Sequence, residues 1–100
     1  MFNYEINRKE NILEIIVEGE FDTEGAKKLQ DDLENYIENN ILSVKFDLSK
    51  TTAMASSGLR VIYYAKEFIK KDMQVDVVGA QGLVMKVIKM SGMSNFVNVV

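Results

Sequence analysis

Apolar and polar residues alternate over residues 2–7, and this period of two predicts a strand with one buried face. A polar break of hairpin length follows at residues 8–11. Residues 12–17 are then apolar except for Glu14, a pattern typical of an interior strand that is covered on most of both faces. A turn is predicted at residues 19–22.

The apolar period then changes to that of a helix, which is predicted from Asp22 or Thr23 to about Asn39. Asp22 or Thr23 can cap the free amides of its first turn. A second helix is predicted from about Ser57 to Lys71, and a short third one is predicted over residues 83–88.

Three further strands are predicted between and after these helices, over residues 42–48, 73–77 and 96–100. The element order is therefore β-β-α-β-α-β-α-β. Strands separated by single helices are normally parallel and joined by right-handed crossovers, which puts the helices mainly on one face when the strands progress in one direction. We therefore expect a single α/β domain over residues 1–100, with an N-terminal hairpin and a mixed, mostly parallel sheet.

The composition excludes several classes of function. The chain has 100 residues, a net charge of -3, and neither His nor Cys. This excludes Ser-His and Cys-His catalysis, disulfides and the usual zinc ligands, so neither an enzyme nor a metal or cofactor site is expected. The acidic balance disfavours nucleic acid, which needs a basic surface. With no apolar run near the ~20 residues that span a bilayer and no secretory signal, we expect a cytoplasmic binding or switching module without membrane insertion.

The densest candidate chemistry lies between the third predicted strand and the second predicted helix. Residues 49–57 carry five hydroxyl side chains in nine residues, at the strand edge where ligands and partners of open α/β sheets tend to meet. One interpretation of Ser56 and Ser57 is structural: they are the N-cap of the helix and its neighbour, and Gly58 allows close packing. The other is that a hydroxyl beside a helix start is a place for a phosphate, because free amides stabilise an anion there.

Three segments resemble one known family. Residues 54–59, Met-Ala-Ser-Ser-Gly-Leu, are similar to the Asp-Ser-Ser-Gly-Leu signature of the STAS family, the anti-sigma factor antagonists. Residues 19–23 look like the family's Gly-Glu-Leu-Asp turn, and residues 89–93 are similar to its Met-Ser-Gly-Leu segment. The resemblance covers nearly the whole chain, and the element order predicted above is also the family's order.

The resemblance implies a switch in protein binding. In such proteins, the Ser that follows the signature Asp is phosphorylated by an anti-sigma factor that is also a serine kinase, and here that residue is Ser56. The unphosphorylated form binds the kinase, the phosphorylated form releases it, and a serine phosphatase resets the switch. The alternative is an accessory subunit that is not phosphorylated, in a lipid-transporting ABC complex or a sensory complex, since STAS domains occur there too.

The sequence departs from the signature at Ala55, where the family carries Asp. One interpretation is a harmless substitution that keeps Ser56 as a kinase substrate. The other is that Ser56 is a poor substrate, which leaves the module permanently in its binding form.

The polar side of the second predicted helix is the candidate docking surface, because Tyr and Arg are enriched in interfaces. The alternative is an ordinary solvated face. This side also includes Glu67, Lys70 and Lys71. The residues that we assign to partner binding are Ala55, Ser56, Ser57, Gly58, Arg60, Tyr63 and Tyr64.

Three methionines near the C-terminus also have two possible roles. Met85, Met90 and Met93 either fill the core or provide adaptable contacts to a partner.

Overall fold

The computed structural model describes residues 2–36, 41–66 and 74–100. The elements, in chain order, are β1 (Asn3–Lys9), β2 (Ile12–Phe21), α1 (Thr23–Leu33), the 3-10 helix η1 (Glu34–Tyr36), β3 (Ser43–Met54), α2 (Ser56–Tyr64), β4 (Gln74–Val78), α3 (Gly82–Met90), the 3-10 helix η3 (Met93–Asn95) and β5 (Asn98–Val99).

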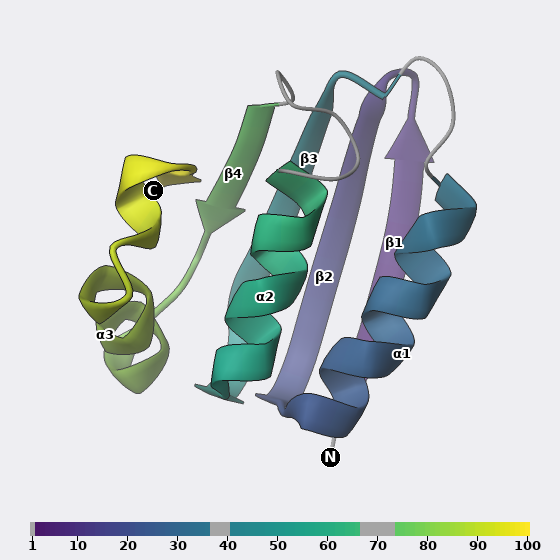
Figure 1. Cartoon of the computed structure of the whole chain (residues 1–100). Coiled ribbons are helices and arrows are strands. Elements are labelled where there is room, and N and C mark those ends of the chain that lie inside the picture. The colour runs from purple at the N-terminus through teal and green to yellow at the C-terminus, as the bar shows by residue number, and fades with distance from the viewer. Residues whose placement is uncertain (1, 37–40, 67–73) are drawn as a thin grey trace.

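Within the described residues the strands form one five-stranded sheet in the order β1-β2-β3-β4-β5 (Figure 1). β1 and β2 form an antiparallel hairpin, in which Tyr4 pairs with Val17, and the remaining neighbours are parallel. The mixed, mostly parallel sheet with an N-terminal hairpin is therefore confirmed.

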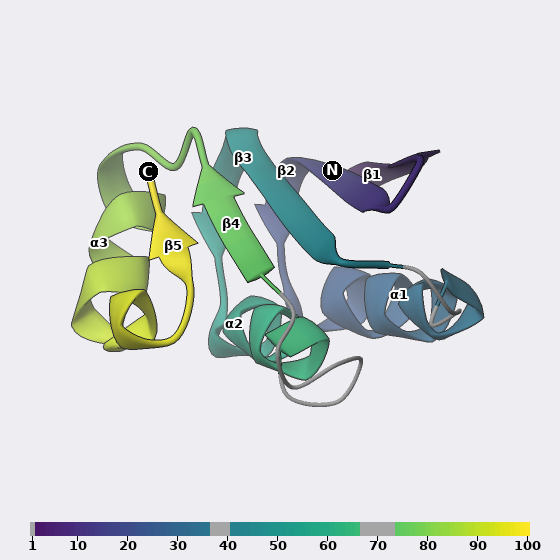
Figure 2. The same ribbon diagram turned by 90° about the horizontal axis from the view of Figure 1, so that it is seen from above.

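The helices lie on one side of the sheet, with α1 and α2 side by side beneath it and α3 at the β4–β5 edge (Figure 2). The core fills this side: the inward residues Ile15, Val17 and Phe46 of the central strands are 0% exposed, as are Leu29 of α1 and Ile62 of α2. Full burial of such side chains contributes about 1.5–3 kcal/mol each, so this one layer of contacts holds the domain together.

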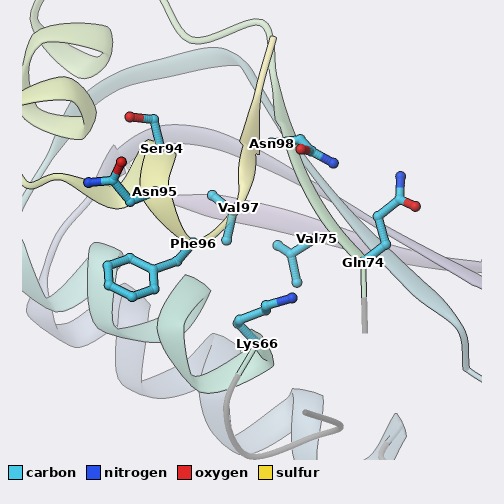
Figure 3. Close-up of a pocket in the computed structure, with 8 residues that line it drawn as sticks. All are labelled: Lys66, Gln74, Val75, Ser94, Asn95, Phe96, Val97 and Asn98. Carbon is cyan, nitrogen blue, oxygen red and sulfur yellow. The ribbon is translucent and has the colours of Figure 1, made fainter. Parts of the chain in front are cut away.

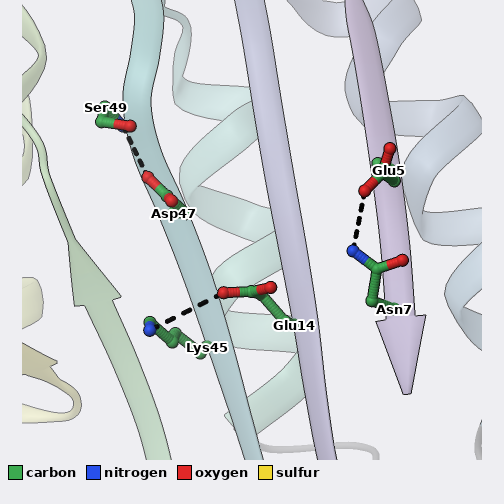
Figure 4. A network of polar contacts seen from close by, with 6 residues as sticks. All are labelled: Glu5, Asn7, Glu14, Lys45, Asp47 and Ser49. Carbon is green, nitrogen blue, oxygen red and sulfur yellow. Dashed lines mark hydrogen bonds and ion pairs between the residues drawn. The ribbon is translucent and has the colours of Figure 1, made fainter. Parts of the chain in front are cut away.

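The opposite face of the sheet carries polar side chains that contact one another (Figure 4). Lys45 forms an ion pair with Glu14 at 3.7 Å, across β3 and β2. Asp47 accepts a hydrogen bond from the Ser49 backbone N–H at 3.0 Å, and that bond holds the pKa of the Asp47 carboxyl below its usual range. This face explains why β3 and β4 alternate between apolar and polar residues.

Two strands extend further than the sequence pattern predicts. β2 continues through the expected turn to Phe21, with a register shift at Gly19, where φ is +85°. β3 runs to Met54 rather than to Leu48, because Glu20 and Phe21 of β2 pair with Ala53 and Met54. The polar residues of this extension do not alternate, so they resemble a linker when the sequence is read alone.

Other boundaries differ by smaller amounts. α1 ends at Leu33 instead of about Asn39, and β5 covers only Asn98–Val99. α3 ends before Gly92, which has a left-handed φ of +77°. The predicted helical residues 37–39 and 67–71, and Met73 at the start of the fourth predicted strand, lie outside the described residues.

Candidate functional site

The site is built at the edge where parallel strands end and helices begin. β2 leads through Asp22 into α1, and β3 leads through Ala55 into α2. The Ala55 N–H donates a hydrogen bond to the Phe21 carbonyl oxygen at 3.0 Å, which ties the two connections together. The first turns of α1 and α2 are therefore neighbours on one exposed edge of the molecule.

Ser56 and Ser57 differ in what their hydroxyl groups contact. Ser57 Oγ lies 2.8 Å from Thr23 Oγ1 of α1, a hydrogen-bond distance. Ser56 is the first residue of α2, is exposed, and has no side-chain hydrogen bond to any residue that the structure describes. Ser56 is thus the more accessible of the two hydroxyl groups.

The cap of α2 is Ala55, so the interpretation of Ser56 and Ser57 as the N-cap and its neighbour is wrong. Both serines already have helical positions, and Ala55 has no side-chain oxygen with which to accept from the first amides. The cap of α1 shows the difference, because the Asp22 carboxylate there accepts from the Gly25 N–H at 2.8 Å. The Asp that the STAS resemblance would place at residue 55 is absent, and with it a side-chain cap for this helix.

Gly58 is buried beneath this turn. A Cβ atom placed on it would lie 3.1 Å from the ring of Phe21 and 3.2 Å from Met54 Cγ. Its close packing agrees with the structural interpretation of the sequence, and it gives a partner no side chain to contact.

Arg60 is exposed on the side of α2 that faces α1. A groove of about 200 Å³ runs between the two helices there. The groove is lined by Thr23, Ala26, Lys27, Gln30, Asp31, Ser57 and Arg60.

Tyr63 and Tyr64 point to different neighbours. The Tyr63 ring packs edge-on against Phe96 with ring centroids 5.4 Å apart, and it also contacts the core. The Tyr64 hydroxyl donates to Glu34 Oε1 at 3.4 Å, and burial raises the Tyr64 pKa, with Glu34 adding to the rise. The structure therefore groups Ser56, Ser57 and Arg60 but does not group the two tyrosines with them.

The remaining residues of the predicted polar side, Glu67, Lys70 and Lys71, lie outside the described part of the chain.

The methionines of the C-terminal region divide between the two expected roles. Met93 is fully buried and Met85 packs partly against the core, whereas Met90 is 78% exposed.

Sequence reasoning did not single out Leu83, the first residue of the third predicted helix. Leu83 is 72% exposed at the start of α3. Like α2, this helix begins at the end of the sheet where the parallel strands finish (Figure 1). A signal was present: Leu83 and Val84 are adjacent, so one narrow apolar stripe cannot bury both.

A larger depression of about 340 Å³ lies at the other end of α2, between Lys66, β4, η3 and β5 (Figure 3). Phe96 and polar side chains such as Gln74, Asn95 and Asn98 line it. It shares no lining residue with the α1–α2 groove, so it is separate from the site at Ser56.

The described residues offer neither a metal site nor a membrane-spanning helix. No cluster of three or more His, Cys, Asp or Glu residues could hold a metal ion there. None of the described helices has the length and apolar character to cross a bilayer.

Solved structures with this fold include anti-sigma factor antagonists. SpoIIAA in its unphosphorylated form aligns with a TM-score of 0.86 and 14% identity, over 98% of this chain and 88% of that one. An antagonist from Mycobacterium paratuberculosis gives a TM-score of 0.87 and 18% identity, over 99% and 85%. The phosphorylated form of SpoIIAA from Bacillus aligns with a TM-score of 0.78 and 13% identity, over 98% of this chain and 91% of that one. At these identities the likeness shows the fold.

No curated protein sequence matches the chain. The STAS domain family, by contrast, matches residues 3–100. Since this match spans nearly the whole chain and the fold agrees with it, the protein belongs to the STAS domain family.

Proposed function

We propose that this STAS domain is a regulatory module that binds an anti-sigma factor with serine kinase activity, in the manner of an anti-sigma factor antagonist. Phosphorylation of Ser56 releases the partner, and a serine phosphatase restores the binding form. The module acts by protein recognition in the cytoplasm and not by catalysis.

One observation carries this proposal: Ser56 is an exposed hydroxyl at the start of α2 with no side-chain hydrogen bond to the described residues. A kinase must bring its nucleotide to the hydroxyl oxygen, so exposure and the absence of a competing bond both favour Ser56 as the acceptor. Ser57 has the same chemistry, but its hydroxyl is engaged with Thr23.

The switch follows from electrostatics. Phosphorylation adds about -1.5 to -2 charges at pH 7 to a position inside the docking surface. A bound partner would have to remove water from this dianion, which is unfavourable without a compensating charge. A difference of about 2.8 kcal/mol between the two forms is enough for a hundredfold loss of affinity.

The docking surface that we propose is centred on the first turn of α2. Ser56 and Arg60 provide its polar part, Ala55 lies beside them, and Leu83 at the start of α3 provides an exposed apolar contact at the same ends of the strands. Tyr63 and Gly58 support this surface from beneath rather than contact the partner, because each packs against interior side chains.

The test mixes the protein with the candidate anti-sigma kinase and ATP and follows its mass. We expect one phosphate on the wild type, none on S56A, and one on S57A, which is the matched control. Phosphate that persists on S56A would contradict the assignment of Ser56. Wild-type protein that binds the kinase tightly without gaining mass would contradict the switch.

A second function is favoured by the cap of α2. Ala55 supplies no carboxylate beside Ser56, and a STAS subunit that is never phosphorylated needs none. Such an accessory subunit of a transporter or sensory complex would co-purify with that complex equally as wild type and as S56D. A partner switch would lose its partner in S56D.

A further inference from the structure

The groove between α1 and α2 contains two cationic side chains from different helices. Lys27 of α1 and Arg60 of α2 both line it, and Ser57 forms part of its wall. Neither cationic group makes an ion pair or side-chain hydrogen bond with any residue that the structure describes. Two positive charges are therefore available within one cavity of about 200 Å³.

Helix geometry directs Arg60 toward Ser56. Residues four apart are neighbours on a helix, separated by about 40° around the axis and about 6 Å along it. Side chains also lean toward the N-terminus of their helix, so Arg60 extends back over the first turn of α2.

Lys27 stands in the same relation to the first turn of α1. It follows Thr23 by four residues, and Thr23 Oγ1 lies 2.8 Å from Ser57 Oγ. A side chain that leans back from Lys27 therefore approaches the Thr23–Ser57 contact, next to Ser56.

The carboxylates near the first turn of α2 lie mostly outside the α1–α2 groove. Glu20 and Asp22 line a different cavity, together with Ala55 at the ends of β2 and β3. In the groove itself the carboxylate is Asp31, one turn beyond Lys27 and thus further from the first turns of both helices. A dianion on Ser56 is repelled by the first pair of carboxylates and attracted by Lys27 and Arg60.

We propose that a phosphate on Ser56, which adjoins the groove-lining residue Ser57, is held in cis at the end of the α1–α2 groove by the Arg60 guanidinium with support from the Lys27 ammonium. This inference rests on the proposed modification of Ser56 and adds what becomes of the phosphate afterwards. Charge-assisted hydrogen bonds to a phosphate are the strong kind, and Arg matches its geometry with two parallel donors. In the phosphorylated protein, Arg60 then binds the phosphate of its own chain and is no longer available to contact a partner.

The test installs phosphoserine at residue 56 during translation, so it needs no kinase. The second pKa of the phosphate, ordinarily about 6, is measured by 31P NMR titration of the full chain. We expect it to be lower in the wild type than in R60Q by about half a unit, and lower than in K27Q by less.

K28Q is the matched control. Lys28 is the next residue of α1 and carries the same charge, but it lines another cavity with Phe2 and Glu24. The pKa in K28Q is expected to equal that of the wild type. Equal values in the wild type and R60Q, or equal rises in K28Q and K27Q, would overturn the inference. A kinase that fails to phosphorylate Ser56 would contradict the proposed function alone, since this titration does not depend on it.

Discussion

The hydroxyl groups of Thr23 and Ser57 lie 2.8 Å apart, although 34 positions separate the two residues in the chain. Their hydrogen bond joins the first turns of α1 and α2. It engages Ser57 and leaves Ser56, the adjacent residue, without a side-chain partner among the described residues. One contact between two exposed side chains thus distinguishes two otherwise similar serines.

We predict that this hydrogen bond has a measurable but small coupling energy. In a double-mutant cycle of T23A and S57A, urea denaturation should give an interaction of about 0.5 kcal/mol, the lower end for an intramolecular hydrogen bond because both groups are exposed. T23S, which keeps the hydroxyl, should retain the coupling. Strictly additive single mutants would show that the contact does not persist in solution.

Replacement of Ala55 by Asp should stabilise the domain. The new carboxylate at the N-cap can accept from the free amides of the first turn, and a good cap contributes about 1 kcal/mol over Ala. Urea denaturation at neutral pH measures the gain. A55N carries the capping oxygen without the charge and should show a gain too. If neither variant exceeds the wild type, the α2 cap described here is incorrect.

Gly79 should tolerate alanine much less well than Gly82. Both have a left-handed φ, of +76° and +54°. A Cβ on Gly79 would lie 2.8 Å from Ser49 Cβ and 3.0 Å from the Ser49 backbone, whereas Gly82 has open space.

We therefore expect G82A to lose about 1 kcal/mol for its backbone conformation alone. G79A should lose about 2–4 kcal/mol, since β3 must also move. The free energies of unfolding of the two variants test this difference, and equal losses would mean that β3 and the residue 79 turn are not in contact.

The stability of the domain should fall at high pH through Tyr4. Burial, followed by its hydrogen bond to Asp32 at 2.9 Å, raises the pKa of Tyr4 to about 12. The folded state therefore holds this proton more tightly than the unfolded state, whose tyrosine titrates near 10. The resulting stabilisation is complete below pH 10 and is lost as the pH rises from 10 to 12.

Tyrosinate absorbance measures this titration. The Y4F variant should lack the transition near pH 12, and its stability should decrease less than that of the wild type over this range. A wild type and a Y4F variant with parallel stability curves between pH 10 and 12 would contradict the burial of Tyr4 against Asp32.

Local patterns determined the order of the elements. The alternation at residues 2–7 and the helical spacing after Asp22 each reflect one buried face, which is a property of neighbouring residues in the chain. The three signature segments indicated the STAS family, and the position of Ser56 within the first of them indicated the candidate phosphorylation site. Local reasoning limited the N-cap of α1 to Asp22 or Thr23, and the structure selects Asp22, whose carboxylate accepts from the Gly25 amide three residues later.

Tertiary contacts decided the rest. The polar end of β3 is a strand because β2 lies beside it and pairs with it, and the Thr51 hydroxyl donates to the Val17 carbonyl oxygen at 2.9 Å. Tyr63 packs against Phe96, from a distant part of the chain, and is therefore only partly exposed. These features depend on which segments meet in space, and an amino-acid pattern reports only what is near in sequence.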